Sequence, residues 1–75
     1  MSRDQLLPDP IERPTISVED AARCLGIGRG AAYSQAREYE RTDGASGLPC
    51  IRMGRTIRVL TAELRRLLRV DRVPA

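Results

Sequence analysis

The stretch SVEDAARCLGIGRGAAY (residues 17–33) decides the fold of this chain, because it contains the signals for one whole helix and for the start of a second. Ser17 followed by Asp20 resembles a capping box, with Asp in place of Glu, and so predicts a helix start. Apolar residues then recur at helical spacing. Gly26 is placed to end that helix, because glycine readily adopts the left-handed conformation found there. We therefore predict a first helix over Val18–Leu25.

A second helix is predicted to follow at once, from Arg29 to about Glu38, with Gly28 at its cap position. The Gly-Ile junction is too short for an antiparallel pair of long helices and fits the sharp turn of a helix-turn-helix unit. One side of this helix carries Ala32, Ala36 and Tyr39, with Gln35 at its edge. The opposite side carries Gly30, Ser34, Arg37 and, if the helix continues that far, Arg41; Tyr33 and Arg29 flank it.

The second half of the chain alternates loop, hairpin and helix signals. Residues 40–47 (ERTDGASG) are a loop by composition. Leu48-Pro49 then leads into a β-hairpin over residues 51–59 (IRMGRTIRV). Thr61 is predicted to cap a last helix. The apolar stripe of that helix is formed by Leu64, Leu67 and Leu68.

The apolar pattern of the hairpin favours one register. A three-residue loop, Gly54-Arg55-Thr56, pairs Met53 with Ile57 and Ile51 with Val59, so that all four apolar residues face inward. A two-residue turn at Gly54-Arg55 would instead set Arg52 beside Ile57. We expect the three-residue loop, although such loops prefer glycine at the last position and here it is first.

In the expected register Arg52 and Arg58 lie directly opposite each other on the outer face. Like charges so placed are unfavourable without a partner, and a phosphate backbone would supply one. Arg55 at the tip adds a third cation. A hairpin with a cationic tip after a helix-turn-helix is typical of a wing, and the alternative is an edge hairpin kept soluble by its arginines.

Length and composition narrow the possible functions. A chain of 75 residues forms one small domain, and without Trp or Phe it has little material for a deep, dry pocket. An enzyme is therefore disfavoured, and no cofactor is expected. The two cysteines lack CxxC spacing and there is no histidine, so we expect buried or half-buried cysteines and no metal site.

Charge is distributed unevenly along the chain. All thirteen basic residues are arginine, which suits phosphate and guanine edges; the alternative explanation is codon bias, as in a GC-rich genome. Residues 1–20 carry two Arg against five acids, and residues 44–69 carry six Arg against one Glu. This asymmetry indicates a surface for nucleic acid or anionic lipid. No stretch has the ~20 apolar residues of a bilayer span, and no signal peptide is apparent, so we expect a cytoplasmic, nucleoid-associated protein.

These elements define the expected fold: mainly α with a small β-hairpin, a winged helix-turn-helix of three helices plus one wing. The expected domain spans residues 15–70. A flexible, proline-rich arm (residues 1–14) precedes it and a C-terminal tail (residues 71–75) follows it.

Three ordered blocks, residues 17–33, 47–59 (GLPCIRMGRTIRV) and 61–68 (TAELRRLL), resemble the excisionase-type DNA-binding family. This is a winged helix-turn-helix family related to mercury-resistance-type regulators. The resemblance implies that the second helix enters the major groove and that the wing touches the neighbouring minor groove or backbone. The implied contacts in the second helix are Arg29, Gly30, Ala31, Tyr33, Ser34 and Arg37. In the wing they are Arg52, Arg55, Thr56 and Arg58.

The resemblance also implies a function. An excisionase, or recombination directionality factor, binds and bends attachment-site DNA so that the integrase of the same element can excise it. Expected partners are double-stranded DNA, that integrase and further copies of the chain stacked along DNA; no membrane is expected. The chain departs from the family where Ala32, Gln35 and Ala36 replace larger aliphatics, at Gly30, and in the longer link over residues 39–46.

Two other functions stay open at the level of sequence. A small transcriptional regulator would have the same DNA-binding pattern. A protein-interaction module would use the arginine face for an acidic partner. The salt dependence of the affinity distinguishes the protein-interaction module from a DNA-binding protein. In a plot of log affinity against log salt concentration, each DNA phosphate that the protein neutralises contributes about −0.9 to the slope.

Overall fold

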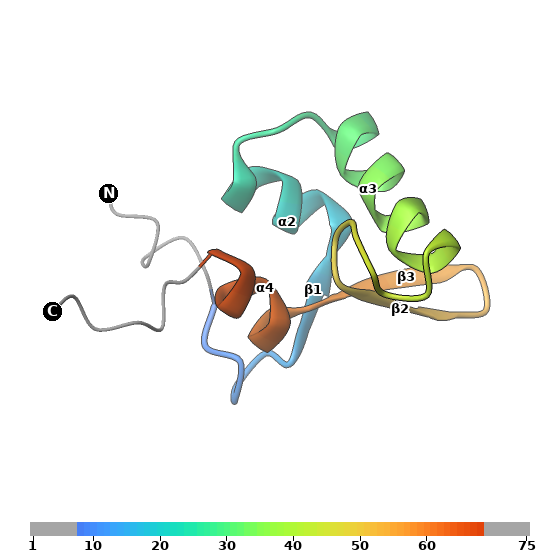
Figure 1. Cartoon of the computed structure of the whole chain (residues 1–75). Helices are drawn as coiled ribbons and strands as arrows, with labels where there is room; N and C mark the ends of the chain where they lie inside the picture. The colour runs from blue at the N-terminus through green and yellow to red at the C-terminus, as the bar shows by residue number, and fades with distance from the viewer. Residues whose placement is uncertain (1–7, 69–75) are drawn as a thin grey trace, which may run out of the picture.

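Within residues 8–68, which the structure describes, the computed structural model contains three helices and one three-stranded antiparallel sheet (Figure 1). The elements are β1 (Thr15–Ser17), α2 (Val18–Leu25), α3 (Arg29–Arg41), β2 (Cys50–Met53), β3 (Thr56–Leu60) and α4 (Thr61–Leu68). The predicted tail over 71–75 lies outside the described residues, as does the predicted arm up to residue 7. The proposed division into arm, domain and tail stays a prediction.

Helix α2 begins and ends where its local signals predict. The Ser17 hydroxyl accepts a hydrogen bond from the Asp20 amide at 2.9 Å, which is the expected cap. At the other end Gly26 adopts φ +71°, and its amide donates to the carbonyls of the last turn. Both ends of the predicted first helix are confirmed.

Helix α3 starts at Arg29 after Gly28, as predicted, but it runs to Arg41 rather than to about Glu38. Two of the three extra residues, Glu40 and Arg41, fall in the segment whose composition predicted a loop. Two interactions extend the helix. Arg41 forms an ion pair with Glu38 at 2.7 Å, one turn back, and the Thr42 hydroxyl donates to the Glu38 carbonyl at 2.8 Å.

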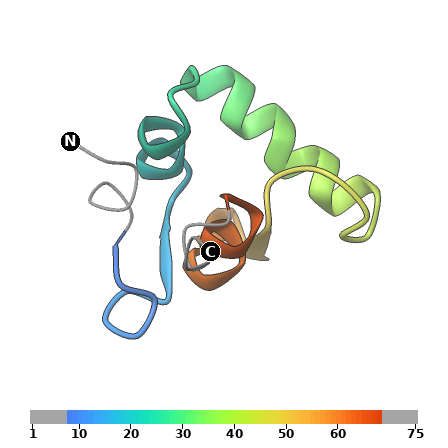
Figure 2. The same ribbon diagram turned by 60° about the vertical axis from the view of Figure 1, so that its left-hand side comes forward.

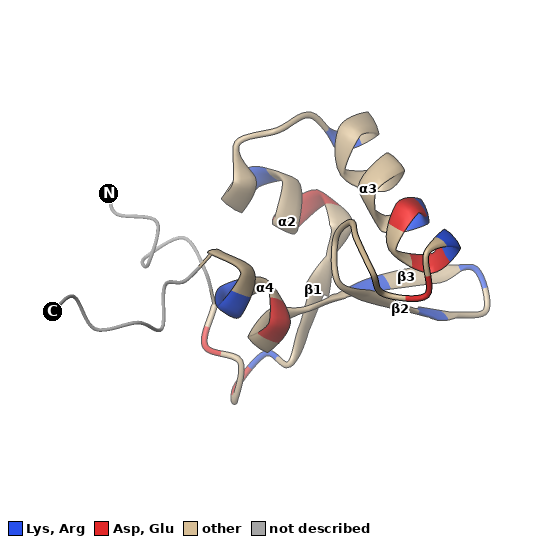
Figure 3. Ribbon diagram, in the orientation of Figure 1, with Lys and Arg blue, Asp and Glu red and all other residues tan. Residues whose placement is uncertain are grey.

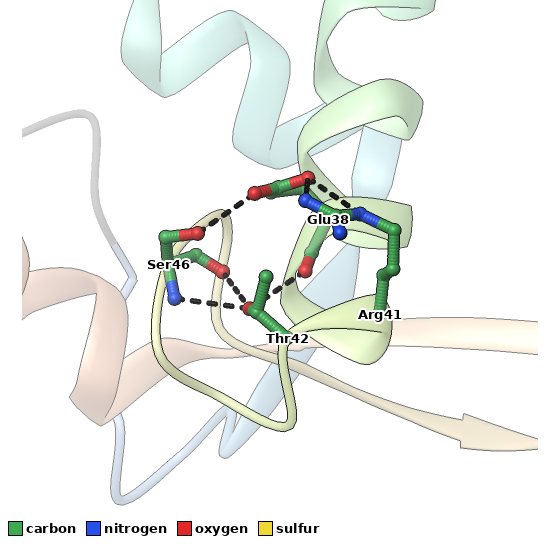
Figure 4. A network of polar contacts seen from close by, with 4 residues as sticks. All are labelled: Glu38, Arg41, Thr42 and Ser46. Atoms are coloured by element: carbon green, nitrogen blue, oxygen red, sulfur yellow. Dashed lines mark hydrogen bonds and ion pairs between the residues drawn. The ribbon is translucent and has the colours of Figure 1, made fainter.

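The loop after α3 is tied back to the helix by a small polar network (Figure 4). The Thr42 hydroxyl accepts from the Ser46 amide at 3.1 Å, and the Ser46 hydroxyl donates to the Glu38 carboxylate at 2.9 Å. Gly47 follows with φ +102°, and a Cβ there would lie 2.5 Å from the Gln35 carbonyl oxygen. Only glycine allows the loop to approach the helix backbone this closely. Residues of this loop and of α4 line an open groove. Figure 2 shows the path of the loop, in yellow, after the end of α3.

Strand β1 was not expected from the sequence. It pairs with β3, which puts Ile16 opposite Val59 and makes β3 the central strand of the order β1-β3-β2. Three residues are too few to show an alternating pattern, and their partner is far along the chain. The strand ties the segment before α2 to the base of the hairpin.

The predicted hairpin register is wrong. Met53 pairs with Thr56 and Arg52 with Ile57, so the turn is the two-residue Gly54-Arg55 rather than a three-residue loop. Gly54 has φ +65° at the first turn position, where a type II′ turn requires glycine. The position of the glycine, rather than the apolar pattern, determines the register.

The observed register changes which apolar residues are covered. Cys50 and Val59 face the core, whereas Ile51 and Met53 lie on the outer face with 40% and 67% of their surface exposed. They had been predicted to face inward. Met53 lies next to the turn, beyond the part of the hairpin that the core covers.

The core is small and mostly aliphatic. Ile16, Val18, Val59 and Leu64 are its largest fully buried apolar side chains. The expected burial of the cysteines is confirmed, since Cys24 and Cys50 are 8% and 5% exposed and form no disulfide.

The start of α4 differs from the prediction. Thr61 is the first helical residue rather than a cap, and its buried hydroxyl has no hydrogen-bond partner. Its amide donates to the Pro14 carbonyl at 3.0 Å instead. Of the predicted stripe, Leu64 is buried and Leu68 packs against the core while partly exposed, whereas Leu67 is 57% exposed.

Candidate nucleic-acid interface

The outward side of α3 is the side predicted from helical periodicity. Ala32 and Ala36 are fully buried against the rest of the molecule, and residues on the opposite side of the helix face solvent. Those exposed residues are Gly30, Ala31, Ser34 and Arg37. Alanine at the buried positions brings the helix close to the core and leaves its other side free.

The N-terminal end of α3 offers an open, uncapped backbone. Gly28 precedes it without a side-chain cap, and the first turn contains no acid. A Cβ added at Gly30 would meet no atom within 4 Å. The first amides of a helix lack intrahelical acceptors and carry a partial positive charge, so this end is suited to a negatively charged group.

Arg29 and Tyr33, both predicted contacts, are held by an acid on α2. One oxygen of Glu19 receives the Arg29 Nε at 3.1 Å and the Tyr33 hydroxyl at 3.0 Å. The Arg29 guanidinium also lies over the Tyr33 ring, 5.5 Å from its centre. Hydrogen bonds from the Glu19 backbone and from Tyr33, together with Arg29, lower the pKa of the Glu19 carboxyl. Glu19 therefore fixes the conformation of both side chains.

Arg37 forms no ion pair with an acid in the described residues, although, after the larger effect of Arg52, its charge contributes to the lowered pKa of Glu40. The Arg37 guanidinium donates to the Ser34 hydroxyl at 3.4 Å. The side chain extends from the exposed side of α3. It is free to bind an outside acceptor.

The predicted arrangement of the hairpin arginines is wrong, because it depended on the register. Arg52 and Arg58 do not lie side by side; they project from opposite faces of the sheet. Arg52 points toward α3 and forms a two-point ion pair with Glu40, Nε to Oε2 at 2.7 Å and Nη2 to Oε1 at 3.0 Å. Arg58 donates to the side chain and the carbonyl of Thr15, each at 3.2 Å.

The Glu40–Arg52 pair shifts the pKa of both partners in the direction that favours their charged forms. The hydrogen bond from Arg52, followed by its charge, lowers the pKa of the Glu40 carboxyl. The same contact raises the pKa of the Arg52 guanidinium. The pair is charged throughout the neutral range and links β2 to the last full turn of α3.

Arg55 occupies the tip of the hairpin. It is exposed, it belongs to the turn itself, and it has no ion pair or hydrogen bond to another described residue. Thr56 beside it is also exposed. Figure 3 shows basic positions along the hairpin and mixed charges at the C-terminal end of α3.

The structure therefore divides the predicted contacts into groups. The α3 residues lie on one exposed side, and Arg55 and Thr56 lie at the hairpin tip. Arg29 and Arg52 are exposed, but each forms an ion pair with a glutamate. Sequence reasoning missed both acids: Glu19 was given no role, and Glu40 meets Arg52 only in the observed register.

Comparisons with known proteins add no relative. No family model, no curated protein and no solved structure matches the chain. In the part of the chain that the structure describes, no group of three or more Cys, Asp or Glu residues is arranged to hold a metal ion. No helix in that part has the length and apolar character needed to cross a bilayer.

Proposed function

We propose that this protein binds double-stranded DNA as a winged helix-turn-helix, with α3 in the major groove and the β2–β3 hairpin as the wing. The observation that carries the proposal is a pair of exposed arginines that form no ion pair within residues 8–68, Arg37 on the outer side of α3 and Arg55 at the hairpin tip. A guanidinium that is not paired with a carboxylate can form charge-assisted hydrogen bonds with a phosphate or a base edge.

Each part of the proposed interface has a defined role. Gly30 and Ala31 let the start of α3 approach the groove, and its first amides face the phosphate backbone. Ser34 and Arg37 face base edges, where arginine forms a two-point contact with guanine. Arg55 and Thr56 contact the backbone next to that groove. Arg29 and Tyr33 form the margin of the interface.

We further propose that the DNA is attachment-site DNA and that the chain acts as an excisionase. This step rests on the resemblance of residues 17–33, 47–59 and 61–68 to that family. The partners would be the integrase of the same element and further copies bound along the DNA. Bending of the DNA by adjacent copies would allow the integrase to assemble an excising complex.

A salt titration of duplex binding tests the proposed DNA contact. Fluorescence anisotropy with a labelled random duplex should show affinity falling steeply with salt, with a log–log slope of about −0.9 for each phosphate neutralised. A single-stranded oligonucleotide and an acidic peptide of equal charge serve as controls. If the duplex does not bind at low salt, or if the peptide binds as well as the duplex, the proposal fails.

Footprinting tests the biological role. Duplexes from the chromosomal region around the coding sequence should contain repeated protected sites at an attachment junction. Protection of a single promoter, with no junction, would instead favour a small transcriptional regulator.

A further inference from the structure

The seam between α3 and the hairpin is narrow, and one side-chain pair dominates it. Apart from the apolar contacts of the core, α3 meets β2 through the Cys50 thiol, which donates to the Ala36 carbonyl at 3.6 Å, and through Glu40–Arg52. The thiol contact is weak and close to the base of the hairpin. The ion pair lies farther out, nearer to the tip.

The geometry of the pair commits one of the two fork-like edges of Arg52. Both oxygens of Glu40 bind the Nε–Nη2 edge of the guanidinium, which leaves only the Nη1–Nη2 edge for a two-point contact with a phosphate. The side chains are 43% and 30% exposed, so the pair is partly shielded from water. To bind the Nε–Nη2 edge, a phosphate would have to displace a carboxylate that is already well placed.

We infer that Glu40 and Arg52 are positioning residues that hold the hairpin at a fixed distance from α3, so that Arg37 and Arg55 reach the same duplex together. We call the Glu40–Arg52 pair a strut, meaning that it fixes the position of the hairpin relative to α3, and in this role Arg52 is not a DNA ligand. The inference rests on the proposed function for its purpose, although the strut itself exists without DNA.

A strut at this place has a physical reason. Pairing with β1 holds the base of β3, through Ile16 opposite Val59, but β1 stops before the outer half of the hairpin. Without Glu40–Arg52 the tip would have more freedom to move. Two binding elements act together only when the link between them suits the spacing of their sites, so a mobile tip binds less well.

The direction in which one substitution changes the DNA affinity distinguishes a strut from a carboxylate that competes with DNA for Arg52. Glu40→Gln removes a negative charge near the proposed interface, which by electrostatics alone should tighten DNA binding. If Glu40 only competes with phosphate for Arg52, affinity rises. If the pair is a strut, affinity falls about threefold or more, as expected when a partly shielded pair is lost. Glu63→Gln, which breaks the Glu63–Arg66 pair on α4, is the matched control and should change affinity little.

Substitutions of Arg52 provide a second test. Arg52→Lys keeps the charge but loses the two-point fork, so a strut predicts weaker binding with an unchanged salt slope. A phosphate ligand predicts nearly normal affinity for Arg52→Lys, and for Arg52→Gln a slope smaller in magnitude by about 0.9. The exchanged pair, Glu40→Arg with Arg52→Glu, should restore the order of the hairpin.

The decisive measurement needs no DNA. Heteronuclear ¹⁵N NOE values of Gly54 and Arg55 should fall in Glu40→Gln and Arg52→Lys, stay unchanged in Glu63→Gln and recover in the exchanged pair. Equal values in the unmodified protein and Glu40→Gln would overturn the strut and leave the proposed function standing. Failure of the unmodified protein to bind duplex would overturn the proposed function, whatever the NOE values show.

Discussion

At the scale of single residues, Arg37 is the side chain with the most specific proposed role. We expect Arg37→Ala to cost ~1–3 kcal/mol on the preferred site and to reduce the preference over random duplex, because a two-point guanine contact would be lost. Competition binding with specific and random duplexes measures both effects. An equal loss on every sequence would make Arg37 a phosphate contact.

Arg55 should behave differently from Arg37. Contacts to the DNA backbone carry no sequence information, so Arg55→Ala should weaken binding to specific and random duplex alike and reduce the salt slope in magnitude by about 0.9. The control is Arg66→Ala on α4, whose exposed arginine pairs with Glu63. A sequence-selective loss in Arg55→Ala, or an equal loss in the control, would contradict the proposed wing.

Thr61 offers a test of stability. Its buried hydroxyl lacks a partner, and such a group costs about 1–3 kcal/mol compared with its hydrogen-bonded state. Thr61→Val keeps the shape and removes the polar atom, so we expect the free energy of unfolding to rise by about 1 kcal/mol. Urea unfolding measures this, with exposed Thr56→Val as the matched control. A loss of stability in Thr61→Val would mean that the hydroxyl has a partner in solution.

At the scale of elements, the hairpin register is the feature to test. Val59 is fully buried, whereas Met53 is 67% exposed. Val59→Ala should therefore lower the free energy of unfolding by about 2 kcal/mol, and Met53→Ala should change it by less than about 0.5 kcal/mol. Urea unfolding of the two variants decides the question. Similar losses would indicate the three-residue loop, in which both side chains face inward.

The elements that the sequence predicts well are those with local signals. Helix α2 has a cap at Ser17 and a stop at Gly26, so both of its ends were predictable. Strand β1 has no local signal, because three residues take their conformation from pairing with β3. In the hairpin the apolar pattern and the turn chemistry disagreed, and the conformation of Gly54 prevailed.

The candidate site was predictable to a similar extent. The exposed side of α3 follows from helical periodicity alone, and Arg55 lies in the turn in either register. The partners of the other arginines do not follow from periodicity. Glu40 meets Arg52 only after the helix extends past Glu38 and the hairpin takes its observed register.

At the scale of the whole molecule, the carboxylates set the response to pH. The pKa values of Glu19, Glu38 and Glu40 lie below the ordinary 4.5, through hydrogen bonds and neighbouring arginines. A lowered pKa in the folded state means that the stabilisation is complete above the ordinary pKa. It is lost as pH falls through the lowered value.

Unfolding experiments check this expectation. Because the chain has no histidine, its stability should be nearly constant between about pH 5 and 8 and should decline only in more acid solution. A variant with all three glutamates replaced by glutamine should show a shallower acid decline. An unchanged decline would assign the effect to other carboxyl groups.

The reactivity of the buried Cys50 thiol provides a measure of how often the seam between α3 and the hairpin opens. Burial, followed by the charge of Glu40, raises the pKa of this thiol, so a thiol-specific dye reacts with it only when the hairpin swings away from the helix. With Cys24 replaced by alanine, the labelling rate would count these openings in the unmodified seam. Duplex added to the same cuvette would reveal whether docking shuts the seam.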